Sequence, residues 1–288
     1  MGTHVNGPLH YAILDPTGNV TALVEDEVAV GLQPEVAARV MERHPEVEQV
    51  GFVRMAPLAG KSEGTYAELR MAGGEFCGNA TMSTAALWAL RAGEAAQLPC
   101  EVMLRVCGAS RPVAVRLGRG EDGSFDAGVR MPQALGIQLV RLEAPEVRVG
   151  ADALTPVVMM EGISHAVIEE SSPLYYLREK RDEAVRLVCR WCQMLGADGL
   201  GLMFLGPGTA ERDMEPLVFV PGSDTVVWER SCASGSSAVG MLLAQRRGGP
   251  VSVRLREPGG ALVVESDPVG PSTWLYGSVR LVGEFTLS

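Results

Sequence analysis

Alternating apolar and polar residues in the first half of the chain predict short strands arranged around two helices. Residues 34–43 have helical spacing, and an alanine-rich apolar stretch at 81–92 is typical of a buried helix. A Pro-, Gly- and Asn-containing turn at 15–19 joins the first two strands. The apolar face of the first helix comprises Val36, Ala37, Val40 and Met41. Strands are expected at residues 9–14, 20–24, 49–55, 65–71, 100–106 and 112–117.

The second half repeats this order of elements. Helices are expected at 182–195 and 237–245. Strands are expected at 127–131, 154–161, 164–169, 199–205, 217–220, 251–256, 261–266, 274–282 and 284–287. Few residues are identical between the halves, so the repeat is one of pattern. We therefore expect an α+β protein made of two copies of one unit, each with a central helix and with the site between the copies.

Two cysteines lie in matching surroundings, one in each half of the chain. Cys77 lies in GGEFCGNATMS (73–83), and Cys232 lies in WERSCASGSSA (228–238). Small residues and then an apolar helix-like stretch follow each cysteine, which predicts that each sulfur lies at a helix N-terminus. There the helix dipole and the N–H groups lower the pKa of a thiol and hold an anion. Two such thiols facing each other would remove a Cα proton from one side and return it on the other, the chemistry of a racemase or epimerase without a cofactor.

The plainer interpretation is that Cys77 and Cys232 are small buried apolar residues, since free cysteine is among the most buried residue types. A disulfide between them is a further alternative, for an oxidised and inactive protein. The same loop-to-helix context in both halves favours the interpretation as paired bases.

Composition and charge limit the classes of protein. There are 35 Asp and Glu residues against 25 Lys and Arg, which gives a formal net charge of -10. This balance argues against nucleic acid and anionic membranes as partners. The sequence has no apolar run long enough for a membrane span and no signal-like start. We expect a cytoplasmic enzyme with a small-molecule substrate that works as a homodimer.

The remaining cysteines and the histidines offer a rival from another class, a non-catalytic thiol or metal-binding protein. Cys189 and Cys192 have CxxC spacing but lie in the predicted helix at 182–195, where packing is the simpler interpretation. Cys100 and Cys107 are expected in the core. The histidines form no ligand spacing, and His165 is expected to be packed or to line a pocket. The histidines are His4, His10, His44 and His165. We expect no metal and no cofactor.

Removing a Cα proton also requires that the amino acid be held and its developing charge stabilised. Amides at a helix N-terminus hold a carboxylate and take up part of this charge. A carboxylate is needed for the substrate ammonium, and the candidates are Glu48, Glu75 and Glu229. Small residues near both cysteines allow a ligand to approach the backbone: Gly78, Ala233, Ser234 and Gly235.

Several segments in order along the chain resemble the diaminopimelate epimerase-like superfamily, and most closely its cofactor-independent histidine racemases of staphylopine-type metallophore biosynthesis. The segments are DPTGNVT (15–21), EQVGF (48–52), EFCGNATMS (75–83), MPQA (131–134), WERSCASG (228–235) and PGG (258–260). They run through nearly the whole chain.

The resemblance implies two pseudo-symmetric domains, each a β-barrel-like sheet around a central helix. The first would span 1–129 with a return strand at 277–288, and the second would span 130–276. It implies that Cys77 and Cys232 are the paired bases. The substrate contacts that it implies, together with the carboxylate candidate before the second cysteine, are Asn19, Glu48, Gly78, Asn79, Glu229, Ala233 and Ser234.

The chain differs from diaminopimelate epimerases in two segments and lacks the arginine that binds the second amino-acid group of diaminopimelate. Those enzymes carry Gly-Asn-Asp-Phe in the first turn and Glu-Arg-Gly with Gly-Glu-Thr before the second cysteine, whereas this chain has GNVT (18–21) and WERS (228–231). The usual arginine for the distal amino-acid group is absent from its place, and the usual Gly after the second cysteine is Ala233. Because an unpaired charge in a closed site is costly, histidine is expected before diaminopimelate or another polar amino acid.

Overall fold

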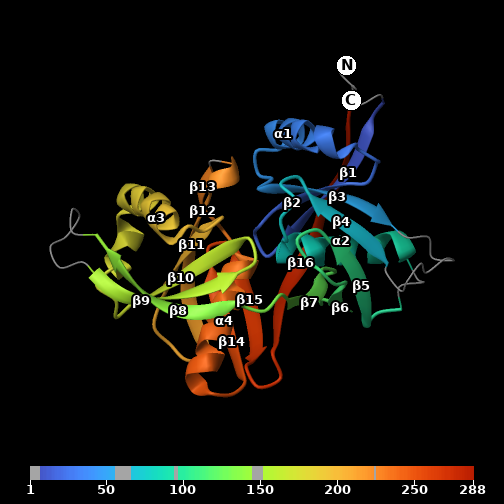
Figure 1. Cartoon of the computed structure of the whole chain (residues 1–288). Helices are drawn as coiled ribbons and strands as arrows, with labels where there is room; N and C mark the ends of the chain where they lie inside the picture. Colours follow the sequence, from blue (N-terminus) through green and yellow to red (C-terminus); the bar gives the residue numbers. More distant parts are fainter. Residues whose placement is uncertain (1–6, 56–65, 94–96, 145–151, 224) are drawn as a thin grey trace. The chain divides into compact units, whose positions relative to one another are not determined.

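The computed structural model divides the chain into two compact units, each described here by itself (Figure 1). The first unit comprises Met1–Arg130 and Tyr276–Ser288, and the second comprises Met131–Leu275. The structure describes residues 7–55, 66–93, 97–144, 152–223 and 225–288.

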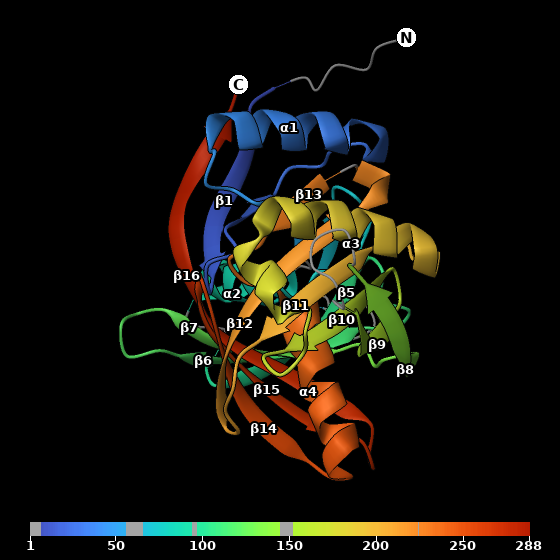
Figure 2. The same cartoon turned by 90° about the vertical axis from the view of Figure 1, so that its left-hand side faces the viewer.

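In the first unit, eight strands of the described residues form a closed sheet. Each of β1 to β7 pairs with the next, β7 pairs with β16, and β16 pairs back with β1. The β1–β16 pairing is antiparallel and runs from Leu9 opposite Leu287 to Pro16 opposite Val279; the two strands lie side by side in Figure 2. The strands are β1 (Leu9–Pro16), β2 (Thr21–Val24), β3 (Gln49–Met55), β4 (Ala67–Met71), β5 (Cys100–Val106), β6 (Val113–Arg119), β7 (Phe125–Met131) and β16 (Ser272–Leu287).

Helix α2 (Gly78–Ala92) lies inside this closed sheet. Every residue from Gly78 to Ala89 is buried, and most of these are small, so strands β1 to β6 approach the helix closely. Helix α1 (Gln33–Arg43) covers the outer face, after the short turn η1 (Val30–Leu32). Its Val36, Ala37 and Val40 pack against apolar residues of β1, β2 and β3. The sheet is therefore apolar on both faces where the helices cover it.

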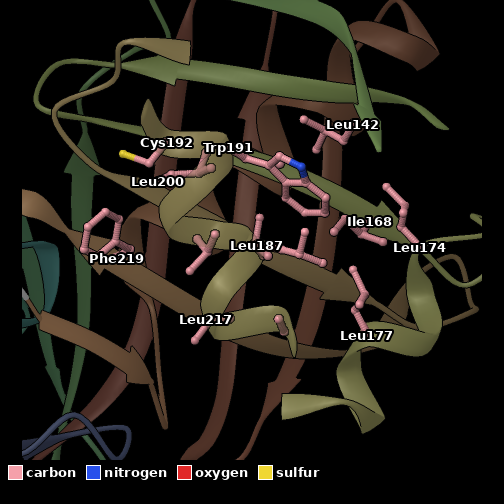
Figure 3. Close-up of a cluster of buried hydrophobic side chains, with 14 of the residues drawn as sticks. Leu142, Ile168, Leu174, Leu177, Leu187, Trp191, Cys192, Leu200, Leu217 and Phe219 are labelled. Atoms are coloured by element: carbon pink, nitrogen blue, oxygen red, sulfur yellow. The ribbon is translucent and has the colours of Figure 1, made fainter. Parts of the chain in front are cut away.

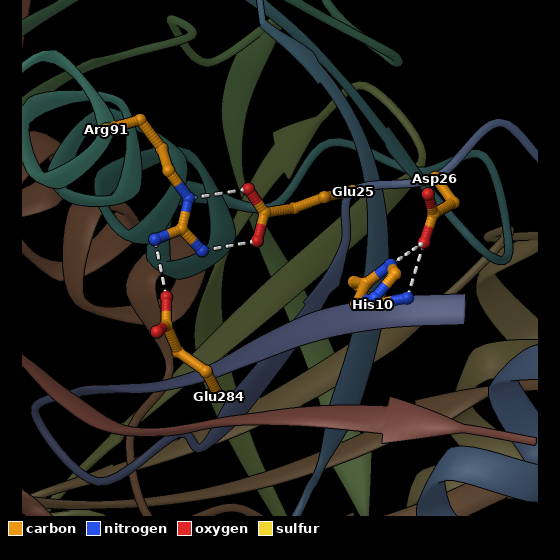
Figure 4. Close-up of polar contacts among 5 residues, drawn as sticks. All are labelled: His10, Glu25, Asp26, Arg91 and Glu284. Atoms are coloured by element: carbon orange, nitrogen blue, oxygen red, sulfur yellow. Dashed lines mark hydrogen bonds and ion pairs between the residues drawn. The ribbon is translucent and has the colours of Figure 1, made fainter. Parts of the chain in front are cut away.

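An ion-pair cluster fixes the C-terminal end of α2 within this unit (Figure 4). Arg91 donates from Nε to Glu25 at 2.8 Å and also pairs with Glu284 of β16. Asp26, next to Glu25, accepts from the His10 ring at 3.0 Å. These contacts join the end of α2 to the loop after β2 and to the last strand. Because Arg91 and Glu284 are well exposed, each pair contributes only about 0–1 kcal/mol to stability.

In the second unit the strand order is β8-β9-β10-β11-β12-β14-β15, with β13 on β12 and the start of β16 beside β15. Helix α3 (Arg181–Leu195), after the turn η3 (Tyr175–Glu179), packs on one face of β10, β11 and β12. Trp191 and Leu187 of α3 lie among Leu142, Ile168 and Leu217 (Figure 3). Helix α4 (Ala233–Arg247) follows β13 and contacts β9, β10, β11, β14 and β15, whereas the short turn η4 (Pro221–Ser223) lies between β12 and β13. The strands are β8 (Gly136–Glu143), β9 (Asp152–Met160), β10 (Ile163–Glu169), β11 (Leu200–Leu205), β12 (Glu211–Val220), β13 (Thr225–Trp228), β14 (Val251–Glu257) and β15 (Gly260–Asp267).

The structure confirms an α+β fold with a closed sheet around a helix, and it corrects several boundaries. The sequence pattern missed β8, in which only one residue is buried, and the four-residue strand β13. The strands expected at 274–282 and 284–287 are one strand, because a register shift opposite Ile13 lets β16 continue through Gly283. Met41 is exposed and does not belong to the packed face of α1. The expected strand start at Thr65 lies outside the described residues.

Candidate functional site

Cys77 begins helix α2, as the sequence predicts. It is the N-cap residue, with extended backbone angles, and its Sγ accepts from the N–H of Ala80 at 3.4 Å. Its carbonyl oxygen accepts from the N–H and the hydroxyl of Thr81, at 3.0 and 2.6 Å. Gly78 and Asn79, the predicted carboxylate-binding residues, are the first residues of the helix. The thiol and the first turn of α2 thus form one rigid element.

A hydrogen-bonded network behind Cys77 brings the predicted Asn19, Glu48 and Asn79 together. The Cys77 thiol donates to Oε1 of Gln49 at 3.1 Å, and Nε2 of Gln49 donates to Oδ1 of Asn19 at 2.6 Å. Asn79 donates to the same Asn19 oxygen at 3.1 Å. Nδ2 of Asn19 donates to Oε2 of Glu48 at 2.6 Å. The carboxylate of Glu48 is therefore held in one orientation by Asn19, which also binds the Gln49 amide next to the Cys77 thiol.

The centre of this network is Gln49, which the sequence interpretation missed. The parallel pairing of β2 and β3 sets Thr21 opposite Gln49, and Nε2 of Gln49 donates to the Thr21 hydroxyl at 2.7 Å. Side chains on a strand alternate between faces, so Gln49 points to the α2 side while Val50 packs under α1. Its place directly after Glu48 in the EQVGF segment was the signal available in the sequence.

A second cysteine fixes the loop that leads to Cys77. The Sγ of Cys107 accepts from the N–H of Met71 at 3.1 Å and donates to the carbonyl of Glu75 at 2.9 Å. Gly108 has φ +72°, and a Cβ there would lie 2.4 Å from the Phe76 nitrogen. Cys107 was expected in the core, but it is half-buried and lines a surface groove of about 420 Å³. The side chain of Glu75 is exposed, and only its carbonyl takes part in this contact.

Cys232 begins helix α4 in the second unit in the same way. It is the N-cap residue, and its Sγ accepts from the N–H of Gly235 at 3.4 Å and lies 3.6 Å from the Ser234 hydroxyl. Ala233 and Ser234 are the first residues of the helix. A Cβ on Gly235 would lie 2.1 Å from the sulfur of Met203, so a larger residue here would displace the Met203 side chain. The prediction that both sulfurs lie at helix N-termini is confirmed.

The surroundings of Cys232 correct the expectation that its pKa is low. Its side chain is 5% exposed, and burial raises the pKa of the thiol well above its usual value, with Glu229 and Glu257 adding to the effect. Two nearby carboxyl groups and the loss of water therefore outweigh the helix dipole. Glu229, a predicted substrate contact, does lie beside this thiol, whereas Glu257 was not identified from the sequence.

His165 lies on the α4 side of β10 and is fully buried. Neither ring nitrogen has a hydrogen-bond partner among the described residues. A Cβ on Gly201 would lie 2.5 Å from its Nδ1, so the ring packs directly against the backbone of Gly201. Burial lowers the pKa of His165 to about 3, and the ring is neutral at physiological pH. The expectation of a packed histidine is confirmed.

The two cysteines with CxxC spacing take part in the packing of the second unit. Cys192 is buried in the core beneath α3 and its thiol donates to the Ala197 carbonyl at 3.2 Å, while Cys189 packs beside that core. Among the described residues there is no group of three His, Cys, Asp or Glu side chains that could hold a metal ion. In the same part of the chain, no helix is both long and apolar enough to cross a membrane.

Comparison with known proteins places this geometry in a family. Residues 8–284 match the family model described as the histidine racemase CntK N-terminal domain. A histidine racemase of Fusobacterium nucleatum (strain ATCC 23726) is 26% identical over 283 residues, which are 96% of this chain and 95% of that protein. A histidine racemase of Staphylococcus aureus (strain Mu50) is 26% identical over 281 residues, 95% of each chain.

Solved structures share the fold at much lower identity. A phenazine biosynthesis protein of the PhzF family from Bacillus anthracis has a TM-score of 0.67 at 14% identity and covers 98% of this chain and 99% of its own. A hydroxyproline epimerase from Agrobacterium vitis has a TM-score of 0.66 at 13% identity, with 99% and 94% covered. The sequence match, which spans nearly the whole chain, is the more specific evidence: this protein belongs to the histidine racemase family.

Proposed function

We propose that the protein interconverts L- and D-histidine by a two-base mechanism with Cys77 and Cys232 and without a cofactor. As a member of the histidine racemase family it is an isomerase. The observation that carries the residue assignment is that each unit holds one cysteine as the N-cap of its central helix. A single thiol would exchange a proton on one face of Cα, whereas racemisation needs a proton donor on each face.

The proposed reaction removes one proton from Cα and adds one proton to its opposite face. For one enantiomer the thiolate of one cysteine takes the Cα proton and becomes a thiol, while the thiol of the other gives its proton to the opposite face and becomes a thiolate. The electron pair of the broken C–H bond is shared with the substrate carboxylate in the transition state and then forms the new C–H bond. The product leaves the two cysteines in exchanged protonation states, ready for the reverse direction.

The first turns of α2 and α4 are proposed to hold the substrate carboxylate. Gly78 and Asn79 begin α2, and Ala233 and Ser234 begin α4. The amide groups at a helix N-terminus carry partial positive charge, and they stabilise the extra negative charge that a carboxylate gains when the Cα proton is removed. These fixed dipoles need no reorganisation during the reaction.

Glu48 is proposed to bind the substrate ammonium, with Asn19 holding the carboxylate in place. The 2.6 Å hydrogen bond from Asn19 supports this, because it holds the Glu48 carboxylate in one orientation. Glu229 is proposed as the acidic contact from the second unit. An ammonium paired with a carboxylate keeps its charge, and this charge acidifies the adjacent Cα–H.

We further propose that the two units are pseudo-symmetric domains, 1–129 with 277–288 and 130–276. The order of pairings supports this. In the first unit, β2 and β3 are parallel across α1 and β4 and β5 are parallel across α2. In the second, β10 and β11 are parallel across α3 and β12 and β14 are parallel across α4.

The biological setting is proposed from the same resemblance. D-Histidine made here would be a precursor of an opine-type metallophore, and the enzyme would act as a homodimer that needs no pyridoxal phosphate and no nucleic acid. Because both bases are thiols, the reaction requires a reducing compartment such as the cytoplasm. Diaminopimelate ranks below histidine, because the arginine expected for its distal end is absent from its place in the sequence.

The test is solvent deuterium exchange at Cα, with purified protein, a panel of L- and D-amino acids and no added cofactor. We expect exchange and racemisation of histidine in wild type and near-total loss of racemisation in Cys77→Ser and Cys232→Ser. Cys100→Ser, at a half-exposed cysteine of β5, is the matched control and should keep wild-type rates. Wild-type racemisation in either active-site variant would refute the two-base mechanism.

A further inference from the structure

Glu257 is a buried carboxyl group in direct contact with the element that holds Cys232. It is the last residue of β14 and is 8% exposed. Its Oε2 accepts from the backbone N–H of Cys232 at 2.7 Å, and its Oε1 accepts from the hydroxyl of Ser236 at 2.5 Å. Each oxygen thus binds the start of α4, one on either side of the first helical turn.

The groups that act on the Glu257 carboxyl are two hydrogen-bond donors, Ser236 and the Cys232 N–H, and the charge of Glu229. The loop before α4 contributes Glu229 and the Cys232 thiol, and α4 contributes only the hydroxyl of Ser236. On the adjacent strand β15, the residue paired with Glu257 is Gly260, which has no side chain to contribute. On β14 itself the neighbouring Arg256 pairs with Glu211 and Asp213 and, by strand alternation, points to the opposite face.

Because of this burial the pKa of Glu257 is raised to about 8. The hydrogen bonds from Ser236 and Cys232 lower it in part, and the charge of Glu229 raises it. At neutral pH the carboxyl group is therefore mostly protonated, whereas in mildly alkaline solution it becomes an anion beside the thiol. Two interacting groups of this kind titrate as a pair.

We infer that Glu257 is a positioning residue for Cys232 whose protonation state decides how readily that thiol becomes a thiolate. The inference rests on the proposed role of Cys232 as a base. While Glu257 is neutral, a thiolate at Cys232 is the single negative charge that the pair must hold. Once Glu257 ionises, a thiolate would be a second buried negative charge, and Cys232 stays protonated.

The hydrogen bond from the Cys232 N–H to Glu257 also limits which backbone amides at the start of α4 can bind the substrate carboxylate. Since the N–H of Cys232 is occupied by Glu257, the substrate carboxylate is left to the following amides, those of Ala233 and Ser234. In the first unit the residue after β5 is Cys107, whose thiol binds the loop before Cys77. Cys77 is therefore supported by the neutral thiol of Cys107, whereas Cys232 is supported by the carboxyl group of Glu257, which titrates. The two proposed bases should for this reason respond differently to pH.

The experiment is a thiolate titration by ultraviolet absorbance in the absence of substrate. The signal of Cys232 is the difference between each protein and the same protein carrying Cys232→Ser. Glu257→Gln keeps the shape and an oxygen acceptor but cannot ionise. We expect the ionisation midpoint of Cys232 to fall by about one pH unit or more in Glu257→Gln, because a neighbouring negative charge has been removed.

Two further variants make the result interpretable. Glu265→Gln, at an exposed glutamate of β15, removes the same charge from the surface and should leave the midpoint unchanged. Ser236→Ala removes a hydrogen bond that stabilises ionised Glu257, so the carboxyl group stays neutral to higher pH and the midpoint of Cys232 should fall by less than in Glu257→Gln. An unchanged midpoint in Glu257→Gln, or an equal shift in Glu265→Gln, would overturn the inference.

The titration does not depend on turnover, so the two proposals fail separately. A midpoint shift in a protein without racemase activity would support the link between Glu257 and Cys232 and count against the proposed reaction. Racemisation that needs both cysteines, together with no shift, would keep the reaction and overturn the role of Glu257.

Discussion

The thiol of Cys77 donates a 3.1 Å hydrogen bond to Oε1 of Gln49, and the same amide holds Asn19 through its nitrogen. The Gln49 side chain is thus oriented by one donor, the Cys77 thiol, and by two acceptors, on Asn19 and Thr21, and its oxygen faces the sulfur. A neutral amide beside the thiol orients it without adding charge. The proposed base of the first unit is therefore positioned by β3 as well as by its own helix.

Replacing Gln49 with Glu tests this relationship. The variant keeps the length of the side chain but sets a carboxylate beside the sulfur, which opposes thiolate formation and also loses the donor to Asn19. We expect kcat for histidine to fall by roughly 10- to 100-fold, with the rate maximum moved to higher pH. Gln138→Glu, at an exposed position of β8, is the control for added charge. An unchanged pH–rate profile in Gln49→Glu would contradict the role of the amide.

The substitution Glu48→Gln tests the ammonium contact. Glu48 is half-buried and its carboxylate accepts from Asn19, so a Gln of the same shape removes the charge and leaves the strand intact. We expect histidine turnover to fall severely while the thermal midpoint changes little, since substitutions outside the core rarely shift stability much. Glu46→Gln, at an exposed position two residues earlier, should leave turnover unchanged. A wild-type rate in Glu48→Gln would remove this residue from the site.

Cys107→Ala tests whether the loop before Cys77 is fixed from β5. The variant loses the bonds to Met71 and Glu75, one of which is only two residues from the proposed base. We expect the alkylation rate of Cys77 to change and kcat to fall several-fold, with a stability loss of about 1 kcal/mol. Cys107→Ser, which keeps a donor and an acceptor, should restore most of the activity. If Ala and Ser behave alike, the contact has no part in positioning Cys77.

The cysteine loops were predictable from the sequence because their signal is local. A residue that begins a helix is marked by the small residues after it and by the apolar stretch that follows, and both Cys77 and Cys232 carry this mark. Strand β5, in which buried and exposed residues alternate, and strand β3, a mostly buried run, were predicted with the bounds that the structure gives them. Strand β8, in which only one residue is buried, carries little alternation and was missed.

The residues that contact the two cysteines were not predictable, because pairing between strands that are separated in the sequence brings them into contact. Gln49 reaches Cys77 from β3, and Glu257 reaches Cys232 from β14, at sequence separations of 28 and 25. The pKa of Cys232 was misjudged because the helix dipole can be read from the sequence, whereas burial and the carboxyl group of Glu257 cannot.

The buried imidazole of His165 should lower the free energy of unfolding at acidic pH, and one substitution should remove this pH dependence. Its pKa in the folded protein is lowered by burial to about 3, against 6.5 for an exposed imidazole. A depressed folded-state pKa means that the unfolded chain binds a proton more readily, so this contribution to stability is complete above pH 6.5 and is lost as the pH falls from 6.5 toward 3. Integrated over that range, the loss is on the order of 3–5 kcal/mol.

In His165→Leu the buried position no longer titrates, and an apolar group of similar size replaces a ring without hydrogen-bond partners among the described residues. We expect the free energy of unfolding, measured by urea denaturation, to fall less steeply between pH 6.5 and 4 than in wild type. His10→Gln, at an exposed histidine of β1, should keep the wild-type slope. Equal slopes in wild type and His165→Leu would show that the ring takes up its proton without unfolding, and therefore that water or a ligand reaches it in the folded protein.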